Sequence, residues 1–151
     1  MTELALIVGA GPGLSASIAK LCASNNMKVI LASRNIDKLN SIKKEINAAT
    51  ISCDSSDIKS VQKLFKDVDK IGVPNLVIYN PSMRIKGSIT DLDPIQTQQA
   101  INVTCFGAFL VAQEASKRML KRKSGSIFLL EHLLVLKASQ IHLYLQWENL
   151  V

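Results

Sequence analysis

A glycine-rich turn directly after a short apolar run most limits what this chain can fold into. The run covers residues 4–8, and the turn places Gly9, Gly11 and Gly13 before an amphipathic segment that begins at Leu14. A continuous apolar run of this length is typical of a parallel strand buried on both faces, and the amphipathic segment predicts a helix. A strand, a tight turn and a helix in this order predict the first unit of a parallel α/β fold.

The sequence repeats this alternation of strand and helix signals as far as residue 129. Further strands are expected at residues 27–33, 49–53, 74–80 and 125–130, and further helices at 35–48, 56–68 and 94–123. Such alternation implies right-handed crossovers and helices on both faces of a parallel sheet. We therefore predict an α/β fold with a doubly wound parallel sheet of about five strands. Ligands of this architecture bind at the carboxyl ends of the strands.

Apolar side chains at helical spacing predict which helix faces are buried. We expect the core to include Ile58, Val61, Leu64, Phe65 and Val68 of the third helix, and Phe106, Phe109 and Leu110 of the fourth.

Composition excludes several classes of protein. With 151 residues, 48% of them hydrophobic and 20% charged, the chain is long enough for a single core and is not a disordered polymer. The apolar runs are far shorter than the roughly 18 residues of a membrane span. The first residues lack the basic region and cleavage site of a signal peptide, so we expect no targeting segment. Three widely spaced cysteines, Cys22, Cys53 and Cys105, are expected to be reduced core residues of a cytoplasmic protein.

Neither the histidines nor the basic residues predict a metal or a nucleic acid. His132 and His142 have no second ligand at a metal-binding spacing, so no metal site is expected. The net charge is +6, and much of it lies at residues 117–123, at the end of a predicted helix. Cations complement a helix C-terminus, and no aromatic residues are interleaved with them. We therefore interpret this run as a solvated helix end.

The glycine turn predicts a site for a pyrophosphate. Glycines allow the tight turn and the close approach of a phosphate, so we expect the turn from Gly9 to Gly13 to present bare amide groups. The helix that begins at Leu14 adds free amide groups and a partial positive charge. Roughly 20 residues further on, an Asp or Glu would bind a ribose 2′-hydroxyl, but Ser33 and Arg34 stand there instead. Since an arginine fork can hold a 2′-phosphate, NADP is favoured over NAD. The alternative is that Arg34 is a plain surface cation.

Four motifs in register resemble those of the short-chain dehydrogenase/reductase family. The string "VGAGPGLS" is similar to the family's glycine pattern, although Val8 and Ser15 replace its Thr and its last Gly. The string "CDSSD" resembles the segment after the third strand, and "YNPS" resembles the Asn-Asn-Ala-Gly after the fourth. The string "INVTCFGAF" is similar to the fourth-helix motif. The resemblance covers residues 1 to about 129.

The resemblance implies roles for three more residues. Asp54 would lie at the adenine amino group, Asn80 would be a cofactor-binding residue, and Asn102 would support a proton-relay water in catalysis. With Gly9, Gly11, Gly13, Leu14, Ser33 and Arg34, they complete the candidate site. The activity implied is hydride transfer, with NAD(P), to or from a small-molecule carbonyl or alcohol.

The catalytic set of that family does not occur in this sequence. The resemblance calls for a Ser just past the fifth strand and for a Tyr followed four residues later by a Lys, which lowers the phenol pKa. Here Ser139 is too far along, and Tyr144 is followed four residues later by Glu148, whose charge would raise that pKa. We therefore expect this chain to be truncated and catalytically impaired.

The last residues depart from the pattern of the others. Residues 131–151 hold many leucines, no Gly and no Pro, and a helix is the expected local structure. Codons can be chosen so that a neighbouring reading frame gives the family's own continuation, a polar loop with glycine and then a helix with a lysine. We hypothesise that residues 1–130 are the NAD(P)-binding domain and that 131–151 arise from a frameshift. Without the family's later strands, the fifth strand would become an exposed edge.

Three hypotheses about function stay open at this point. The chain is an NADP-dependent oxidoreductase, a nucleotide-binding fragment without catalysis, or an interaction protein that forms homo-oligomers through the fourth helix. The last rests on the resemblance, since this helix commonly forms a dimer interface in the family.

Overall fold

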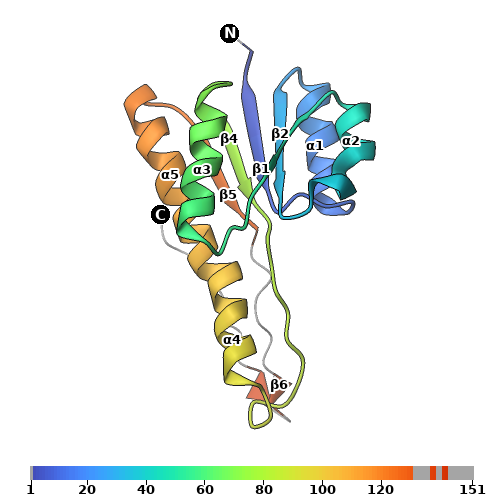
Figure 1. Ribbon diagram of the computed structural model, residues 1–151, viewed down its shortest axis with the longest axis vertical. Helices are drawn as coiled ribbons and strands as arrows, with labels where there is room; N and C mark the ends of the chain where they lie inside the picture. Colours follow the sequence, from blue (N-terminus) through green and yellow to red (C-terminus); the bar gives the residue numbers. More distant parts are fainter. Residues whose placement is uncertain (1, 131–136, 139–140, 143–151) are drawn as a thin grey trace.

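The computed structural model describes residues 2–130, 137–138 and 141–142. Five parallel strands form one sheet in the order β3-β2-β1-β4-β5 (Figure 1). The strands are β1 (Leu4–Val8), β2 (Lys28–Ser33), β3 (Ala49–Ser52), β4 (Leu76–Tyr79) and β5 (Ser126–Leu129). The strand order reverses between β1 and β4, whose carboxyl ends therefore flank the switch point at which such sheets bind ligands. The doubly wound α/β fold predicted from the sequence is confirmed.

The helices lie where the alternation places them, with two differences. They are α1 (Leu14–Ser24), α2 (Asn40–Glu45), α3 (Ile58–Asp69), α4 (Pro94–Ile101) and α5 (Gly107–Arg122). The single helix expected at 35–48 is a 3₁₀ turn, Ile36–Leu39, followed by the short α2. The helix expected at 94–123 is interrupted by a π-helical segment, Asn102–Phe106, which separates α4 from α5. Among the described helices, none is long and apolar enough to cross a bilayer.

Two helices, α3 and α4, begin after an aspartate that caps their N-terminus. The Asp57 carboxylate accepts from the amide of Ser60 before α3, and the Asp93 carboxylate accepts from the amide of Gln96 before α4. These bonds satisfy amide groups that lack an intrahelical acceptor. Pro94 at the first position of α4 loses nothing by having no N–H. Local sequence thus determines where these two helices begin.

The helices cover both faces of the sheet (Figure 1). Helices α3 and α5 pack on one face, in a cluster that includes Phe65, Val111 and Met119. Helices α1 and α2 cover the other face, in a cluster that includes Cys22 and Ile42. Helix α4 and the loop before it run away from the carboxyl end of the sheet (Figure 1).

Four side chains expected in the core are exposed. Ile58 is 47% exposed, Phe106 is 39% exposed and Phe109 is 55% exposed, whereas Leu110 is buried as expected. Cys105 is also exposed, while the other two cysteines are buried free thiols. The two phenylalanines stack on each other, with ring centroids 6.2 Å apart. The 3.6-residue periodicity did not identify them because the π-helical segment changes the angular register of the helix at this point.

The last described residues differ from the helix expected there. Residues Lys137–Ala138 and Ile141–His142 form the short antiparallel strands β6 and β7. The rest of the segment 131–151 lies outside the described residues. Within the described sheet β5 pairs with β4 alone, and the side chains of Phe128 and Leu129 are exposed. The apolar edge expected at the fifth strand is therefore present in the part of the chain that the structure describes.

Arg118 of α5 ties its helix to α3. Its guanidinium holds both oxygens of Asp69 at 2.7 and 2.8 Å, reaches Glu114 at 2.8 Å, and lies 5.0 Å from the centroid of the Phe65 ring. A planar fork is needed to make all these contacts at once. The side chain is only 18% exposed, so solvent screens these bonds less than it screens most surface pairs.

We expect Arg118→Lys to lower the free energy of unfolding by about 1–2 kcal/mol, because an ammonium group cannot hold both oxygens of Asp69. Urea unfolding followed by circular dichroism measures the change. The matched control is Lys20→Ala, which removes a pair with Glu45 whose two side chains are each 51% exposed. That control should change stability by less than about 1 kcal/mol. Equal effects of the two substitutions would contradict this account.

Candidate functional site

A pocket of about 260 Å³ opens at the carboxyl end of the sheet, beside the switch point. Four separate segments supply its walls, namely the ends of β1, β2, β3 and β4 with the residues that follow them, and one residue of the π-helical segment completes it. Its lining residues are Val8, Gly9, Ala10, Ser33, Arg34, Cys53, Asp54, Ser55, Asn80, Pro81, Ser82 and Val103. Five residues predicted as cofactor-binding are among them, although they lie as many as 71 positions apart in the sequence.

Gly9 is required by the geometry of the turn after β1. Its φ of +78° lies in the left-handed region, and a Cβ on it would lie 2.5 Å from the backbone nitrogen of Pro81. Its amide donates to the carbonyl of Ala32 at 2.9 Å, and the amide of Ala10 donates to the same carbonyl at 3.0 Å. The amides at the start of the turn are therefore already occupied, which corrects the expectation that the whole turn presents bare amides.

The free amide groups lie further along, at the start of α1. Among the residues that the structure describes, the amides of Gly11, Gly13 and Leu14 have no hydrogen-bond acceptor. Gly13 precedes the helix without a side-chain cap, and the first turn carries no acidic residue. The helix N-terminus thus keeps its partial positive charge uncompensated. These three residues flank the pocket and are not part of its lining.

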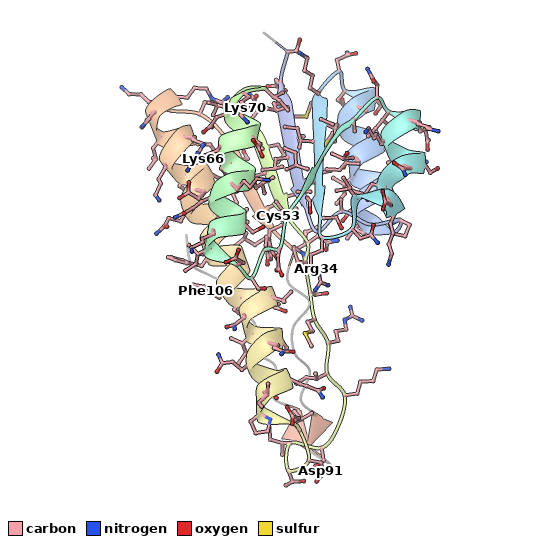
Figure 2. The ribbon with its side chains drawn as sticks, in the orientation of Figure 1. Arg34, Cys53, Lys66, Lys70, Asp91 and Phe106 are labelled. Atoms are coloured by element: carbon pink, nitrogen blue, oxygen red, sulfur yellow. The ribbon has the colours of Figure 1, made fainter. Side chains whose placement is uncertain are left out.

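Ser33 and Arg34 lie at the end of β2 and line the pocket. The carbonyl of Ser33 accepts from the amide of Cys53 at 3.1 Å, which joins the ends of β2 and β3. Figure 2 shows Arg34 and Cys53 at the same end of the sheet. Within the described residues the guanidinium of Arg34 makes no ion pair and no hydrogen bond, and the side chain is exposed. A cationic fork at the rim of the pocket is available for a ligand.

Asp54 lies after β3 and is held by its own turn. Its Oδ1 accepts from the amide and the hydroxyl of Ser56 at 2.9 and 2.7 Å. Hydrogen bonding from Ser56 lowers the pKa of Asp54 below its ordinary value of 3.8, and the charge of Arg34 lowers it further. The carboxylate is therefore ionised at neutral pH. Its second oxygen has no partner among the described residues and can accept a hydrogen bond.

Asn80 connects the end of β4 to the glycine turn. Its Nδ2 donates to the hydroxyl of Ser15 at 2.7 Å, and that hydroxyl donates to the carbonyl of Gly9 at 3.2 Å. Ser15 is buried at the position where the family pattern has a glycine. Its hydroxyl therefore takes a structural role that a glycine could not take. The Oδ1 of Asn80 is buried without a partner in the described part of the chain.

Asn102 is the first residue of the π-helical segment and does not line the pocket. Its carbonyl accepts from the amide of Gly107, five residues later, and its side chain lies 3.5 Å from the Nε2 of Gln98. The next residue, Val103, reaches the pocket instead. Ser139, Tyr144 and Glu148, named above for the catalytic set, lie outside the described residues.

Several lining residues were not predicted as site residues, although they lie within the quoted motifs. Ser55, Ser82 and Val103 follow predicted positions by one or two residues, and only the fold places them in one wall. Burial raises the pKa of the Cys53 thiol, so it is protonated and inert at neutral pH. Behind the pocket, burial raises the pKa of Tyr79 to about 12. Among the described residues no three His, Cys, Asp or Glu side chains gather as a metal site would require.

Strand order, switch-point pocket and glycine turn define the class of this protein as a Rossmann-like α/β fold. Comparison with known families then assigns the family. The model of the family described as short chain dehydrogenase matches residues 3–130, and the chain belongs to this family. The resemblance to this family that the sequence motifs indicated is thereby confirmed.

Curated relatives of this chain are named oxidoreductases and are about twice as long as the matched segment. An uncharacterized oxidoreductase of Staphylococcus aureus strain N315 is 29% identical over 129 residues, which cover 83% of this chain and 56% of that protein. The structure of actinorhodin polyketide ketoreductase with NADPH superposes with a TM-score of 0.79 at 23% identity, over 83% of this chain and 51% of that one. The structure of ElxO with NADP bound gives 0.77 at 25% identity, over 84% and 54%. The chain thus spans about half the length of the relatives it matches.

Proposed function

We propose that this chain binds NADP(H) at the carboxyl end of its sheet, as the nucleotide-binding half of a short-chain oxidoreductase. The observation that carries the proposal is the pocket itself. It joins the glycine turn, Arg34, Asp54 and Asn80, which come from the ends of four neighbouring segments. Its volume of about 260 Å³ is below the roughly 300–1,000 Å³ of most complete ligand pockets, so it would enclose one part of a dinucleotide.

The pyrophosphate would bind at the start of α1. The amides of Gly11, Gly13 and Leu14 are without acceptors in the described chain, and the uncapped helix N-terminus attracts an anion. Neither Gly11 nor Gly13 has an atom within 4 Å of the position of a Cβ. The space that a phosphate needs for close approach is therefore open.

Arg34 and Asp54 would bind the adenosine half. The guanidinium would hold the 2′-phosphate of NADP, which a carboxylate at this position would repel. The free oxygen of Asp54 would accept from the adenine amino group, and Ser33 and Asn80 would complete the pocket walls. On this assignment NADP binds more tightly than NAD.

The reaction proposed for the whole protein is hydride transfer to or from a small carbonyl or alcohol. When bound, the nicotinamide would supply the hydride, and a proton would be exchanged at the substrate oxygen. We assign Asn102 to the support of a proton-relay water, as in the family pattern. Since the sequence lacks the Ser and the Tyr-x-x-x-Lys of that pattern, we propose that the chain binds nucleotide and turns over slowly or not at all.

The division of the chain is also a proposal. Residues 1–130 would form the nucleotide-binding domain, and residues 131–151 would be the product of a frameshift. The family match, which ends at residue 130, supports this division. Sequencing the gene decides it, because codons that give no family-like continuation in either neighbouring frame would rule it out. The free cysteines support our placement of the protein in the cytoplasm.

The test of nucleotide binding is a fluorescence titration of the purified chain with NADPH and, separately, with NADH. We expect saturable binding of NADPH with a dissociation constant at least about tenfold lower than that of NADH, because one charge-assisted contact contributes about 1.5–3 kcal/mol. A panel of carbonyl substrates run alongside reports turnover. Folded protein that binds neither nucleotide would end the proposal.

Exposed aromatic residues favour a second candidate function, self-association through the helical surface formed by the π-helical segment and α5. Phe106 and Phe109 stack on each other on this surface, although side chains of this size are usually buried. We propose that a second copy of the chain covers them. Sedimentation should then show a dimer, and Phe109→Ser should shift it to a monomer without loss of fold.

A further inference from the structure

Tyr79 ends β4 and is almost completely buried behind the pocket. In the sheet it pairs with Val8 of β1 and with Leu129 of β5. Its ring belongs to the core cluster that packs against α5, together with Ala108 and Val111. A tyrosine in such a core needs a hydrogen-bond partner for its hydroxyl, because an unpaired buried hydroxyl is costly.

The hydroxyl of Tyr79 has two partners. It contacts the carbonyl of Val103 in the π-helical segment and lies 3.2 Å from the hydroxyl of Ser55 after β3. A phenol has one proton, and a carbonyl can only accept. The phenol therefore donates to Val103 and accepts from the Ser55 hydroxyl, which satisfies all three groups.

Gly107 provides the space for this bridge. A Cβ at this position would overlap the Tyr79 hydroxyl and would lie 2.7 Å from the carbonyl oxygen of Ser55. Any larger residue would push the start of α5 away from both. Gly107 also donates the hydrogen bond that closes the π-helical turn onto Asn102. The start of α5, Tyr79 and the loop at Ser55 therefore pack together as a single unit.

Both partners of the hydroxyl line the pocket. Ser55 directly follows Asp54, which the proposal places at the adenine, and Val103 directly follows Asn102, which it places in catalysis. One hydroxyl behind the pocket thus connects the loop that carries Asp54 to the π-helical segment that carries Asn102. Among the described residues, Tyr79 is the only side chain whose hydrogen bonds link residues 53–57 to the π-helical segment.

We propose that Tyr79 is a positioning residue for the nucleotide, whose hydroxyl holds Ser55 and Val103 at the spacing that the bound dinucleotide requires. The inference rests on the proposed function and adds a residue that does not touch the ligand. It also explains why a large aromatic residue with a polar group, and not a purely apolar one, ends β4.

The test is Tyr79→Phe, which keeps the ring and removes the hydroxyl. We expect the dissociation constant of NADPH, measured by fluorescence at 10 °C, to rise about tenfold in protein that circular dichroism shows to be folded. Ser55→Ala should raise it less, and should have no further effect in the Tyr79→Phe background, because both changes break the same bridge. Additive effects of the two substitutions would contradict the bridge.

The control separates positioning from loss of stability. Val68→Ala removes buried volume from α3, at a residue that does not line the pocket, and should lower Tm while leaving NADPH affinity within twofold. If wild type binds NADPH and Tyr79→Phe binds it equally well, the inference is wrong and the proposed function stands. If wild type itself does not bind, the proposed function fails first. Should Tyr79→Phe not fold, unchanged affinity in Ser55→Ala overturns the inference.

Discussion

Gly9→Ala is expected to lower the free energy of unfolding by about 2–5 kcal/mol. A left-handed backbone costs a residue with a side chain about 1–2 kcal/mol, and the φ of Gly9 is +78°. The added Cβ would also lie 2.5 Å from the backbone nitrogen of Pro81, and overpacking of this kind costs about 1–3 kcal/mol. Because the neighbour is backbone and not a flexible side chain, little relaxation is available. Such a loss is a large part of the roughly 5–15 kcal/mol that stabilises a domain.

Thermal unfolding measures this effect, and two neighbouring glycines provide matched controls. Gly11→Ala and Gly13→Ala put the same methyl group where no atom lies within 4 Å and where φ is not in the left-handed region. We expect their stability to change by less than about 1 kcal/mol. They should nevertheless lose NADPH binding, since the methyl group would occupy the space proposed for the pyrophosphate. A Gly9→Ala protein as stable as these two would contradict the strain argument.

Arg34→Glu is expected to weaken NADPH binding by about a hundredfold and not to weaken NADH binding, since a carboxylate at this position can accept from the ribose 2′-hydroxyl of NADH. The substitution removes a charge-assisted contact of about 1.5–3 kcal/mol and puts a negative charge beside the 2′-phosphate. A hundredfold change corresponds to about 2.7 kcal/mol. NADH lacks that phosphate, so neither effect applies to it. Fluorescence titration with the two nucleotides gives both values.

The control for Arg34→Glu must change the net charge equally at a distance from the pocket. Lys66→Glu does so, because Lys66 is on α3 and lies away from the end of the sheet where Arg34 lies (Figure 2). It should alter the affinity for NADPH by less than about threefold at 0.15 M salt, where charges separated by more than about 8 Å are largely screened. An equal loss of NADPH and NADH in Arg34→Glu would show that Arg34 does not select the 2′-phosphate.

The sequence alone predicted much of the fold because the alternation of strand and helix signals is local and strong. The helix that begins at Leu14 and the strand at residues 4–8 were placed correctly, and the other strands differ from expectation by one or two residues at an end. Buried parallel strands have continuous apolar runs, and this pattern leaves few alternatives. The prediction was wrong where the backbone departs from regular periodicity. The π-helical segment is the clearest case, because it turned Phe106 outward.

Candidate site residues were identified where a residue type has a chemical reason to follow a strand. Gly9 and Arg34 are of this kind, whereas Asp54 was predicted from the family resemblance, and the pocket includes all three. The expectation that the glycine turn is bare was corrected at Gly9, whose amide is taken by the carbonyl of Ala32. Hydrogen bonds between strands depend on the register of the sheet, which a local pattern does not contain.

Local spacing in the sequence thus determined the order of the elements, the glycine turn and the cation after β2. Tertiary structure alone decided that Ser55, Tyr79 and Val103 meet, since they lie on three segments as many as 48 residues apart. They can meet because Gly107 has no Cβ to occupy the space beside the Tyr79 hydroxyl and because the backbone forms a π-helical turn there. The physical reason is that a helical or strand period reports which face of an element is buried, but not which atoms of distant segments come into contact there.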